Sequence, residues 1–402
     1  RPRPGGRAAA PLGVGGGGGA GRGWGTGRAG GGGGAGGGWR RHLPGEDGGV
    51  AGDERAPRRG VGTRGRRANR SGLRRPTLVG IVLGAALLVA ACGDGGVTLG
   101  QNKESTPGLG DDVAAAIEPE LPLQVVSDNG ETVTVDSLDR IVSLDGGVTE
   151  ILFALGMGDR LVGRDISTTF AEAEKIPLLT KAHDISAESV LSVRPDMVIA
   201  SELIGPPEAK ASIEAAGVPV VTMNPVVAVD GVGDRIRAVG ELTGVAPAAE
   251  ELAAGLDEEL DEVAAAPAGA EAPLVAFLYV RGSAGVYLMA GPGSGVDSLI
   301  EASGATDASA KIGLSDPFTP LTSEALVKAQ PDVILVTTTG LESVDGVAGL
   351  MQIPGVAQTP AGQSGRVVTM EDGLLFSFGV RTPEVVESLK AAFAESGQPD
   401  RS

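Results

Sequence analysis

Two separate segments of the chain repeat one short pattern, and this repeat limits the folds that the sequence can adopt. Residues 186–199 read Ser-Ala-Glu-Ser-Val-Leu-Ser-Val-Arg-Pro-Asp-Met-Val-Ile, and residues 322–335 read Thr-Ser-Glu-Ala-Leu-Val-Lys-Ala-Gln-Pro-Asp-Val-Ile-Leu. Each segment opens with a hydroxyl residue that can cap a helix, places an acid in the first turn, and stops at Pro-Asp before an apolar strand. The same unit in two corresponding places predicts a duplicated architecture of two similar lobes.

Short apolar runs alternate with helical stretches along both halves of the chain. A hairpin is expected first, at 125–135, because Asp128-Asn129-Gly130 is a strong turn signal between two β-rich runs. The strand-like runs that follow are 141–144, 197–200, 219–222, 275–280, 333–337 and 366–370. Strands separated by helices favour parallel sheets with crossover helices, so the sequence predicts an α/β fold.

One longer helix is expected between the halves. Leu252, Leu256, Leu260 and Val263 recur every three or four residues on an acidic, Ala-rich background, between Pro247 and Pro267. We therefore predict an N-terminal lobe at 121–244, a linker helix at 245–268 and a C-terminal lobe at 269–397. Two lobes joined by one long helix should enclose a cleft with little hinge freedom.

The start of the chain differs sharply from the rest in composition. The first 70 residues hold 27 Gly and 14 Arg against four acids, so 1–72 is expected to be a disordered leader. Because no methionine precedes Met157, we expect part of this leader to lie upstream of the true start. After Cys92 there are 47 Asp and Glu against 17 Lys and Arg, a net charge of −30. Such a field repels nucleic acid, although an Arg/Gly tail that binds nucleic acid stays an alternative for the leader.

Residues 73–92 have the pattern of a signal peptide. Arg74 and Arg75 precede an apolar run of 14 residues at 78–91, which is too short for a comfortable membrane span. Val89-Ala90-Ala91-Cys92 resembles the bacterial lipobox, which implies a lipid anchor on Cys92 and a location on the outer face of the cytoplasmic membrane. Residues 93–120 are then expected to be a flexible tether. The alternative is an ordinary secretory signal with an incidental cysteine.

The globular part resembles the periplasmic binding proteins that serve ABC importers of iron–siderophores, cobalamin and haem. The resemblance rests on residues 140–144 and 149–156, both Pro-Asp repeats, and Gly304-Ala-Thr-Asp307. It implies the class III fold, with two Rossmann-like lobes joined by one long α-helix, and a permease dimer as partner. It also implies acidic docking residues, here Glu150 and Asp307, with Glu301 as an alternative because Thr306 departs from the family pattern.

Candidate ligands for a cargo are few in this part of the chain. It has one histidine, His183, and two tyrosines, Tyr279 and Tyr287. Tyr279 and Arg281 are two residues apart on an expected strand and so project from the same face. Ferric iron binds phenolate well, and a neighbouring guanidinium can favour the phenolate and hydrogen-bond its oxygen.

These residues resemble the site of the haem-binding lipoproteins of actinobacterial haem importers. That resemblance implies haem as the transported ligand, with His183 from one lobe and Tyr279, assisted by Arg281, from the other holding the iron. It implies a monomer that receives haem, directly or from haem-donating surface proteins. Further candidates for the cleft are Tyr287 as a fallback ligand, Lys181, Arg164 and Asn224 for the propionates, and Phe376 and Phe378 at the rim.

Other functions stay open to different degrees. A ferric siderophore or a corrinoid could occupy the same fold, although the sequence shows no Arg cluster of the kind that anionic siderophores need. An enzyme is disfavoured, because the mature part has one histidine, no cysteine beyond Cys92 and no Ser/His/Asp spacing. Nothing but the anchor favours a structural or adhesive role.

Overall fold

The computed structural model describes residues 96–98, 119–181, 184–202, 205–265 and 272–396. All of them belong to one compact unit, Ala86–Ser402. The leader 1–72, the signal peptide 73–92 with Cys92, and His183 lie outside the described residues. Within the described ranges, no helix combines the length and apolar character that a membrane crossing needs.

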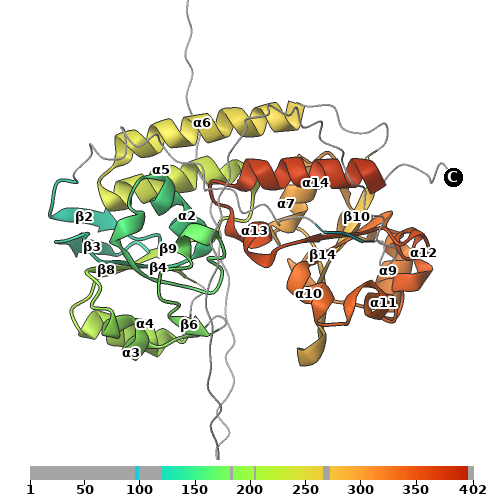
Figure 1. The fold of residues 1–402 in the computed structure, drawn as a ribbon, viewed down its shortest axis with the longest axis horizontal. Coiled ribbons are helices and arrows are strands. Elements are labelled where there is room, and N and C mark those ends of the chain that lie inside the picture. The colour runs from blue at the N-terminus through green and yellow to red at the C-terminus, as the bar shows by residue number, and fades with distance from the viewer. Residues whose placement is uncertain (1–95, 99–118, 182–183, 203–204, 266–271, 397–402) are drawn as a thin grey trace, which may run out of the picture. The chain divides into compact units, whose positions relative to one another are not determined.

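The sheet of the N-terminal lobe is parallel throughout, in the order β5-β4-β8-β9. Every residue of β4 and β9 is buried, which explains why these strands read as continuous apolar runs. Helices α2 and α5 cover one face and α3 and α4 the other (Figure 1). The bounds are β4 Ile141–Leu144, α2 Gly146–Ala154, β5 Leu161–Arg164, α3 Ala187–Ser192, β8 Met197–Ser201, α4 Pro207–Ala215, β9 Val220–Met223 and α5 Val232–Thr243.

The predicted hairpin before this sheet is confirmed. Strands β2 (Leu123–Val126) and β3 (Thr132–Val135) pair antiparallel, and Gly130 adopts the left-handed φ of 84° in the turn between them. Glycine reaches that region without a steric penalty, so the Asn-Gly signal in the sequence reflects the backbone geometry of the turn.

The sheet of the C-terminal lobe is parallel with one antiparallel edge, in the order β1-β15-β14-β10-β11-β13, and β12 also pairs with β10. The antiparallel edge was not predicted; it arises because β10 turns back into β11 through Gly285, whose φ is 67°. The strands are β1 Gly96–Thr98, β10 Leu274–Arg281, β11 Val286–Ala290, β12 Thr306–Asp307, β13 Phe318–Pro320, β14 Val333–Thr337 and β15 Val367–Met370. The helices are α7 Val296–Ala302, α8 Ala308–Ile312, α9 Ser323–Ala329, α10 Thr338–Glu342, α11 Gly346–Leu350, α12 Pro360–Ser364, α13 Asp372–Ser377 and α14 Thr382–Ser396.

Residues 96–98 lie within the segment 93–120 that we expected to be a flexible tether. They form β1, which pairs parallel with β15 at the edge of the C-terminal sheet. An unpaired edge strand offers free backbone N–H and C=O groups, and even a Gly-rich segment can satisfy them because ladder hydrogen bonds do not depend on side chains.

The repeated sequence unit forms the same structure in both lobes. Ser186 caps α3 and Thr322 caps α9, each accepting a hydrogen bond from the backbone amide three residues further on. Beyond each helix, directly before the proline, Arg194 and Gln330 adopt left-handed φ values of 48° and 49°. The duplicated architecture predicted from the sequence is therefore confirmed, and the two units agree even in the φ angle of the residue before the proline.

The aspartate of each Pro-Asp pair links neighbouring strands. The Asp196 carboxylate accepts from the backbone N–H of Arg140 at 3.1 Å, and the Asp332 carboxylate accepts from that of Leu274 at 3.0 Å. Arg140 directly precedes β4, and Leu274 opens β10. The same side chain thus satisfies a backbone amide at the start of β4 in one lobe and of β10 in the other.

The predicted linker helix is α6, Ala246–Ala265, and it packs along α5 and α14 (Figure 1). Small residues make the contact with α5 close: a Cβ added at Gly240 would collide with the Cβ of Ala249. Leu256 is buried, while Leu252, Leu260 and Val263 pack partly buried against the same core. The apolar stripe read from the sequence is therefore the buried face of the helix.

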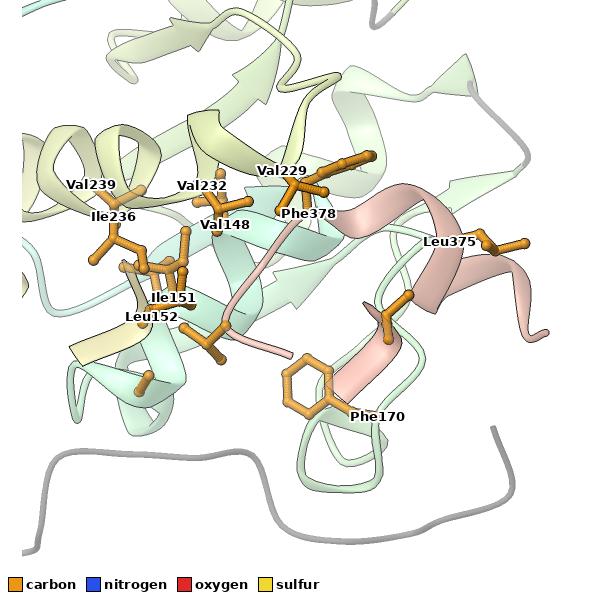
Figure 2. Packing of buried hydrophobic residues seen from close by; sticks show 14 of the residues in the cluster. Val148, Ile151, Leu152, Phe170, Val229, Val232, Ile236, Val239, Leu375 and Phe378 are labelled. Carbon is orange, nitrogen blue, oxygen red and sulfur yellow. The ribbon is translucent and has the colours of Figure 1, made fainter. Parts of the chain in front are cut away.

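Part of the C-terminal sequence packs in the core of the N-terminal lobe. Leu375 of α13 and Phe378 belong to the same buried cluster as Val148 of α2 and Ile236 of α5 (Figure 2). A Cβ added at Gly147 would collide with the backbone oxygen of Ser377. The segment after β15 is thus seated directly on α2.

Candidate ligand-binding site

Tyr279 and Arg281 lie at the end of β10, as predicted, and their side chains are in contact. The guanidinium carbon of Arg281 is 4.4 Å from the centroid of the Tyr279 ring. Arg281 Nη1 donates to the Val280 oxygen at 2.8 Å and to Thr337 Oγ1 at 3.1 Å, and Nη2 donates to the carboxylate of Asp372. The guanidinium thus stacks on the phenol ring, and the hydrogen bonds found for it among the described residues go to Val280, Thr337 and Asp372.

Aromatic side chains surround Tyr279. Its ring centroid lies 6.0 Å from that of Phe318 and 6.3 Å from that of Phe376, both in edge-to-face geometry. Phe376 also packs edge-on against the buried Phe277. Phe318 is 37% exposed, so this aromatic cluster reaches the surface. Phe376, a sequence candidate for the cleft rim, thus lies beside Tyr279, whereas Phe318 was not among the candidates.

Tyr287 lies on the other face of the same sheet. It stands opposite Val280 in the register between β10 and β11, so it shares the face of Val280 and not that of Tyr279. There it lines a cavity of about 520 Å³ together with Ser323, Ser343 and Gln352. Tyr287 therefore cannot replace Tyr279 as a fallback ligand at the same site.

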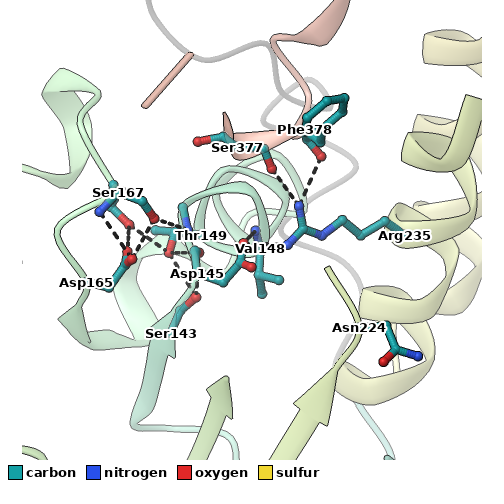
Figure 3. A network of polar contacts seen from close by, with 12 residues as sticks. Ser143, Asp145, Val148, Thr149, Asp165, Ser167, Asn224, Arg235, Ser377 and Phe378 are labelled. Atoms are coloured by element: carbon teal, nitrogen blue, oxygen red, sulfur yellow. Dashed lines mark hydrogen bonds and ion pairs between the residues drawn. The ribbon is translucent and has the colours of Figure 1, made fainter. Parts of the chain in front are cut away.

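The three polar cleft candidates, Arg164, Asn224 and Lys181, are not brought together with Tyr279 by any described contact. Arg164 uses its guanidinium to bind backbone oxygens of Ile176 and Thr168, at 3.1 and 2.9 Å. Asn224 is exposed and stands apart from the polar network drawn in Figure 3. Lys181 ends β6 (Thr180–Lys181), which pairs with β7 (Asp184–Ile185), but its side chain is outside the described residues, as is His183.

Phe378 does not lie at a cleft rim, and that prediction is wrong. The residue is only 4% exposed and belongs to the core cluster. Its φ of 46° puts it in the left-handed region, directly after α13 ends. A bulky phenylalanine rarely adopts this backbone conformation, so nothing in the sequence indicated the turn that places its side chain in the core.

Glu150, the predicted docking acid, is enclosed in the protein. Its side chain is 2% exposed and its Oε1 accepts from Arg381 Nη2 at 2.5 Å. Burial raises the pKa of the Glu150 carboxyl above its usual range, outweighing the attraction of Arg381 and Arg235. A carboxylate that docks on another protein must reach the surface, so this geometry argues against the predicted docking role.

Asp307, the second predicted docking acid, is also buried. It caps α8 by accepting from the backbone N–H of Ser309 at 3.0 Å and from the Ser309 hydroxyl. Burial raises the pKa of its carboxyl despite these hydrogen bonds. The alternative, Glu301, is exposed near the end of α7. Of the docking candidates, Glu301 is therefore the accessible one.

A buried arginine that the sequence did not reveal joins the two lobes. Arg235 Nη2 of α5 lies 2.5 Å from Asp145 Oδ1, and Arg235 Nη1 donates to the backbone oxygens of Ser377 and Phe378 at 2.5 and 3.2 Å (Figure 3). Asp145 also caps α2. No sequence signal indicated the contact with Ser377 and Phe378, because they lie 142 and 143 positions from Arg235.

A buried carboxylate lies close to this arginine site. Asp165 accepts from the Ser167 backbone and hydroxyl groups (Figure 3). It also accepts from the Thr168 hydroxyl. Burial raises its pKa, and the charge of Asp145 raises it further, although the hydrogen bonds act in the opposite direction. Among the described residues, no group of three or more His, Cys, Asp and Glu side chains is placed to hold a metal ion.

Comparisons with known proteins agree on one family. Residues 141–374 match the family described as periplasmic binding protein. An uncharacterized ABC transporter substrate-binding lipoprotein of Bacillus subtilis, YvrC, is 27% identical over 322 residues, 79% of this chain and 95% of its own. A cobalamin-binding protein of Halobacterium salinarum is 24% identical over 267 residues, 65% of this chain and 71% of its own.

Several similar solved structures are described as haem-binding proteins. The periplasmic haem-binding protein RhuT from Roseiflexus sp. RS-1 is 40% identical with a TM-score of 0.61, covering 65% of this chain and all of its own. The haem-binding protein HmuT is 33% identical with a TM-score of 0.69, covering 75% of this chain and 97% of its own. Further HmuT structures carry alanine in place of a histidine, of a tyrosine, and of an arginine two positions after that tyrosine.

Proposed function

The chain belongs to the periplasmic binding protein family, and from this membership we propose that it captures haem between its lobes and delivers it to an ABC importer. The observation that carries the proposal is the end of β10. There a partly buried tyrosine, stacked with Arg281, is surrounded by aromatic side chains that reach the surface. The protein then acts as a carrier and catalyses no reaction.

The residues at this site suit both the iron and the flat macrocycle of a haem molecule. A tyrosine oxygen is a hard ligand and one of the known axial ligands of haem iron. Phe318 and Phe376 offer apolar ring edges to a flat macrocycle, where edge-to-face contacts are favourable. We propose Tyr279 as the ligand to iron, with Arg281 as the neighbour that fixes its ring.

The comparisons support this ligand set. The tyrosine and arginine replaced in HmuT are spaced by two, as Tyr279 and Arg281 are. A histidine replaced in HmuT belongs to the same series. We propose His183, between β6 and β7 in the sequence of the N-terminal lobe, as the ligand from the opposite side.

A corrinoid is the second candidate, because the relative from Halobacterium salinarum is described as a cobalamin-binding protein. In haem the ring leaves the axial positions of the iron open to a protein ligand. In cyanocobalamin both axial positions of the cobalt are already filled, by cyanide and by the base of the corrinoid's own nucleotide, so Tyr279 has no metal position to bind. A ferric siderophore shares this property, since its own oxygens surround the metal. Dependence on Tyr279 therefore separates haem from both alternatives.

The proposed location and partners follow from the family and from the start of the chain. We propose a lipid anchor on Cys92 that holds the protein on the outer face of the cytoplasmic membrane, where a permease dimer is the recipient and haem-donating surface proteins are a source. The similarity to the lipoprotein YvrC supports this arrangement.

The experiment is a titration of the purified chain with hemin, followed by absorption spectroscopy, beside parallel titrations with cyanocobalamin and ferric desferrioxamine. We expect a stoichiometric Soret band that moves or weakens in Tyr279→Phe and in His183→Ala. Tyr287→Phe is the matched control, because this tyrosine lies on the other face of the sheet. Saturable binding of cyanocobalamin or desferrioxamine, with hemin keeping its free spectrum, would refute haem as the cargo.

A further inference from the structure

Asp372, the first residue of α13, holds the arginine that stacks on Tyr279. One carboxylate oxygen accepts from Arg281 Nη2, and the other faces the backbone N–H of Thr339 at 3.4 Å, in the first turn of α10. The Arg281 and Asp372 side chains are each 25% exposed. Because both oxygens have partners, the carboxylate has little freedom to turn away from the guanidinium.

The residues on either side of Asp372 contact Thr169 of the N-terminal lobe. Glu371 accepts a hydrogen bond from the hydroxyl of Thr169 at 3.0 Å. A Cβ added at Gly373 would collide with that same hydroxyl, so the chain passes Thr169 at close range. Asp372 thus binds Arg281 of the C-terminal lobe, while the residues before and after it contact the N-terminal lobe.

The arginine has a second fixed partner in the C-terminal sheet. Thr337, the last residue of β14, accepts from Arg281 through its hydroxyl, and the same hydroxyl accepts from the backbone N–H of Gly340. A guanidinium is a rigid planar group, so contacts at both of its terminal nitrogens determine its plane. The Tyr279 ring lies against that plane.

We propose that Asp372 is a positioning residue for ligand binding: through Arg281 it sets the orientation of the Tyr279 side chain. This inference rests on the proposed role of Tyr279 as the haem ligand. In this proposal Asp372 acts through Arg281: it binds the guanidinium, and the guanidinium stacks on the Tyr279 ring. Because its neighbours Glu371 and Gly373 contact Thr169, the ligand residue of one lobe is kept in place by the position of the other.

Loss of this restraint should weaken binding by a moderate factor. A side chain that is no longer held must be ordered when the ligand binds, which corresponds to about a three- to tenfold loss of affinity for one long side chain. Asp372→Asn keeps the shape and removes the charge that Arg281 needs. Glu342→Gln is the matched control, because Glu342 is an exposed acid at the end of α10, on the element whose first turn Asp372 contacts.

The test is a double-mutant cycle measured by hemin titration of the full chain, with Asp372→Asn, Arg281→Gln and their combination. We expect Asp372→Asn to weaken hemin binding three- to tenfold in the wild-type background and less than about twofold in the Arg281→Gln background. Glu342→Gln should bind like wild type. An equal loss in both backgrounds, or no loss in either, would overturn the proposal, since Asp372 would then not act through Arg281.

A second measurement keeps this inference separate from the identity of the cargo. In the ligand-free protein, the Nε–H resonance of Arg281, assigned by its disappearance in Arg281→Lys, should be shifted by the ring current of Tyr279. We expect Asp372→Asn to abolish that shift and Asp372→Glu, which also serves if the Asn variant fails to fold, to retain part of it. A ring-current shift that persists in Asp372→Asn overturns the proposal, even if the wild-type protein binds hemin. If the shift is lost in Asp372→Asn but the wild-type protein does not bind hemin, only the haem assignment is refuted.

Discussion

Replacing Arg381 with Met should strongly destabilise the protein, because it leaves the Glu150 carboxylate buried without its ion-pair partner. The two side chains are 11% and 2% exposed and meet at 2.5 Å. The pair already lacks full hydrogen bonding, since Glu150 Oε2 and Arg381 Nε are buried without a partner.

The expected loss at neutral pH is about 3–5 kcal/mol in the free energy of unfolding, the usual cost of removing one partner from a buried pair. The double variant Glu150→Met/Arg381→Met should recover most of it and lie within about 2 kcal/mol of wild type, because apolar side chains of similar volume need no solvation. The matched control is Arg237→Met. Arg237 also pairs with acids, Glu250 and Asp257, but at the surface. Arg237→Met should therefore lower the free energy of unfolding by only a small fraction of the loss in Arg381→Met.

The loss should also depend on pH in a defined direction. Burial already raises the pKa of Glu150, and Arg381 is the main attraction that lowers it, so the pKa rises further in Arg381→Met. A carboxyl with a raised pKa in the folded state binds its proton more tightly there than in the unfolded chain. Its contribution to stability is therefore greatest at low pH and is lost as the pH rises through the folded-state pKa. The deficit of Arg381→Met should thus shrink as the pH is lowered from neutral toward the ordinary range of a glutamate.

The assay is urea denaturation of the full chain followed by far-ultraviolet circular dichroism, which does not depend on Trp24 and Trp39 in the leader. The reasoning is refuted if Arg381→Met costs no more than Arg237→Met, or if the losses of the two single Met variants simply add in the double variant. A deficit that grows on acidification would contradict the direction assigned to the Glu150 pKa.

Four further predictions follow from single contacts. Gly147→Ala should lower the free energy of unfolding by about 1–3 kcal/mol in urea denaturation, because the new methyl group meets a backbone oxygen at the end of α13. Gly255→Ala, with open space around the added carbon in α6, should raise it by about 0.5–1 kcal/mol. Phe277→Ala should cost about 3–5 kcal/mol, because this side chain is 1% exposed in the core. Burial raises the pKa of Asp165, so the stability of wild type relative to Asp165→Asn should increase as the pH falls; a constant difference between the two denaturation curves would contradict that shift.

The elements that the sequence predicts well are those with local signals. The Pro-Asp units, the hairpin around Gly130 and the linker helix each depend on residues within about ten positions of one another, and each forms as expected. The position of Tyr279 and Arg281 on one strand face also follows from a local rule, the period of two in a strand.

The contacts that the sequence could not predict join residues far apart. Glu150 and Arg381 are 231 positions apart, and Arg281 and Asp372 are 91 apart. A helix acid at the surface and one in the interior look alike in a sequence, so Glu150 was interpreted as a docking residue. Composition also could not show that Tyr287 lies on the opposite face from Tyr279, because this depends on the register between β10 and β11.

The packing of α13 against α2 limits how the two lobes can be exchanged between related proteins. The residues that cover Gly147 and accept from Arg235 come from the far end of the gene, after the last strand of the other lobe. A chimaera of two relatives joined at the linker helix α6 would therefore separate residues of one lobe from their packing partners. A chimaera that keeps the partners of Arg235 and Glu150 together must take the first lobe and the stretch from 371 to 382 from the same parent.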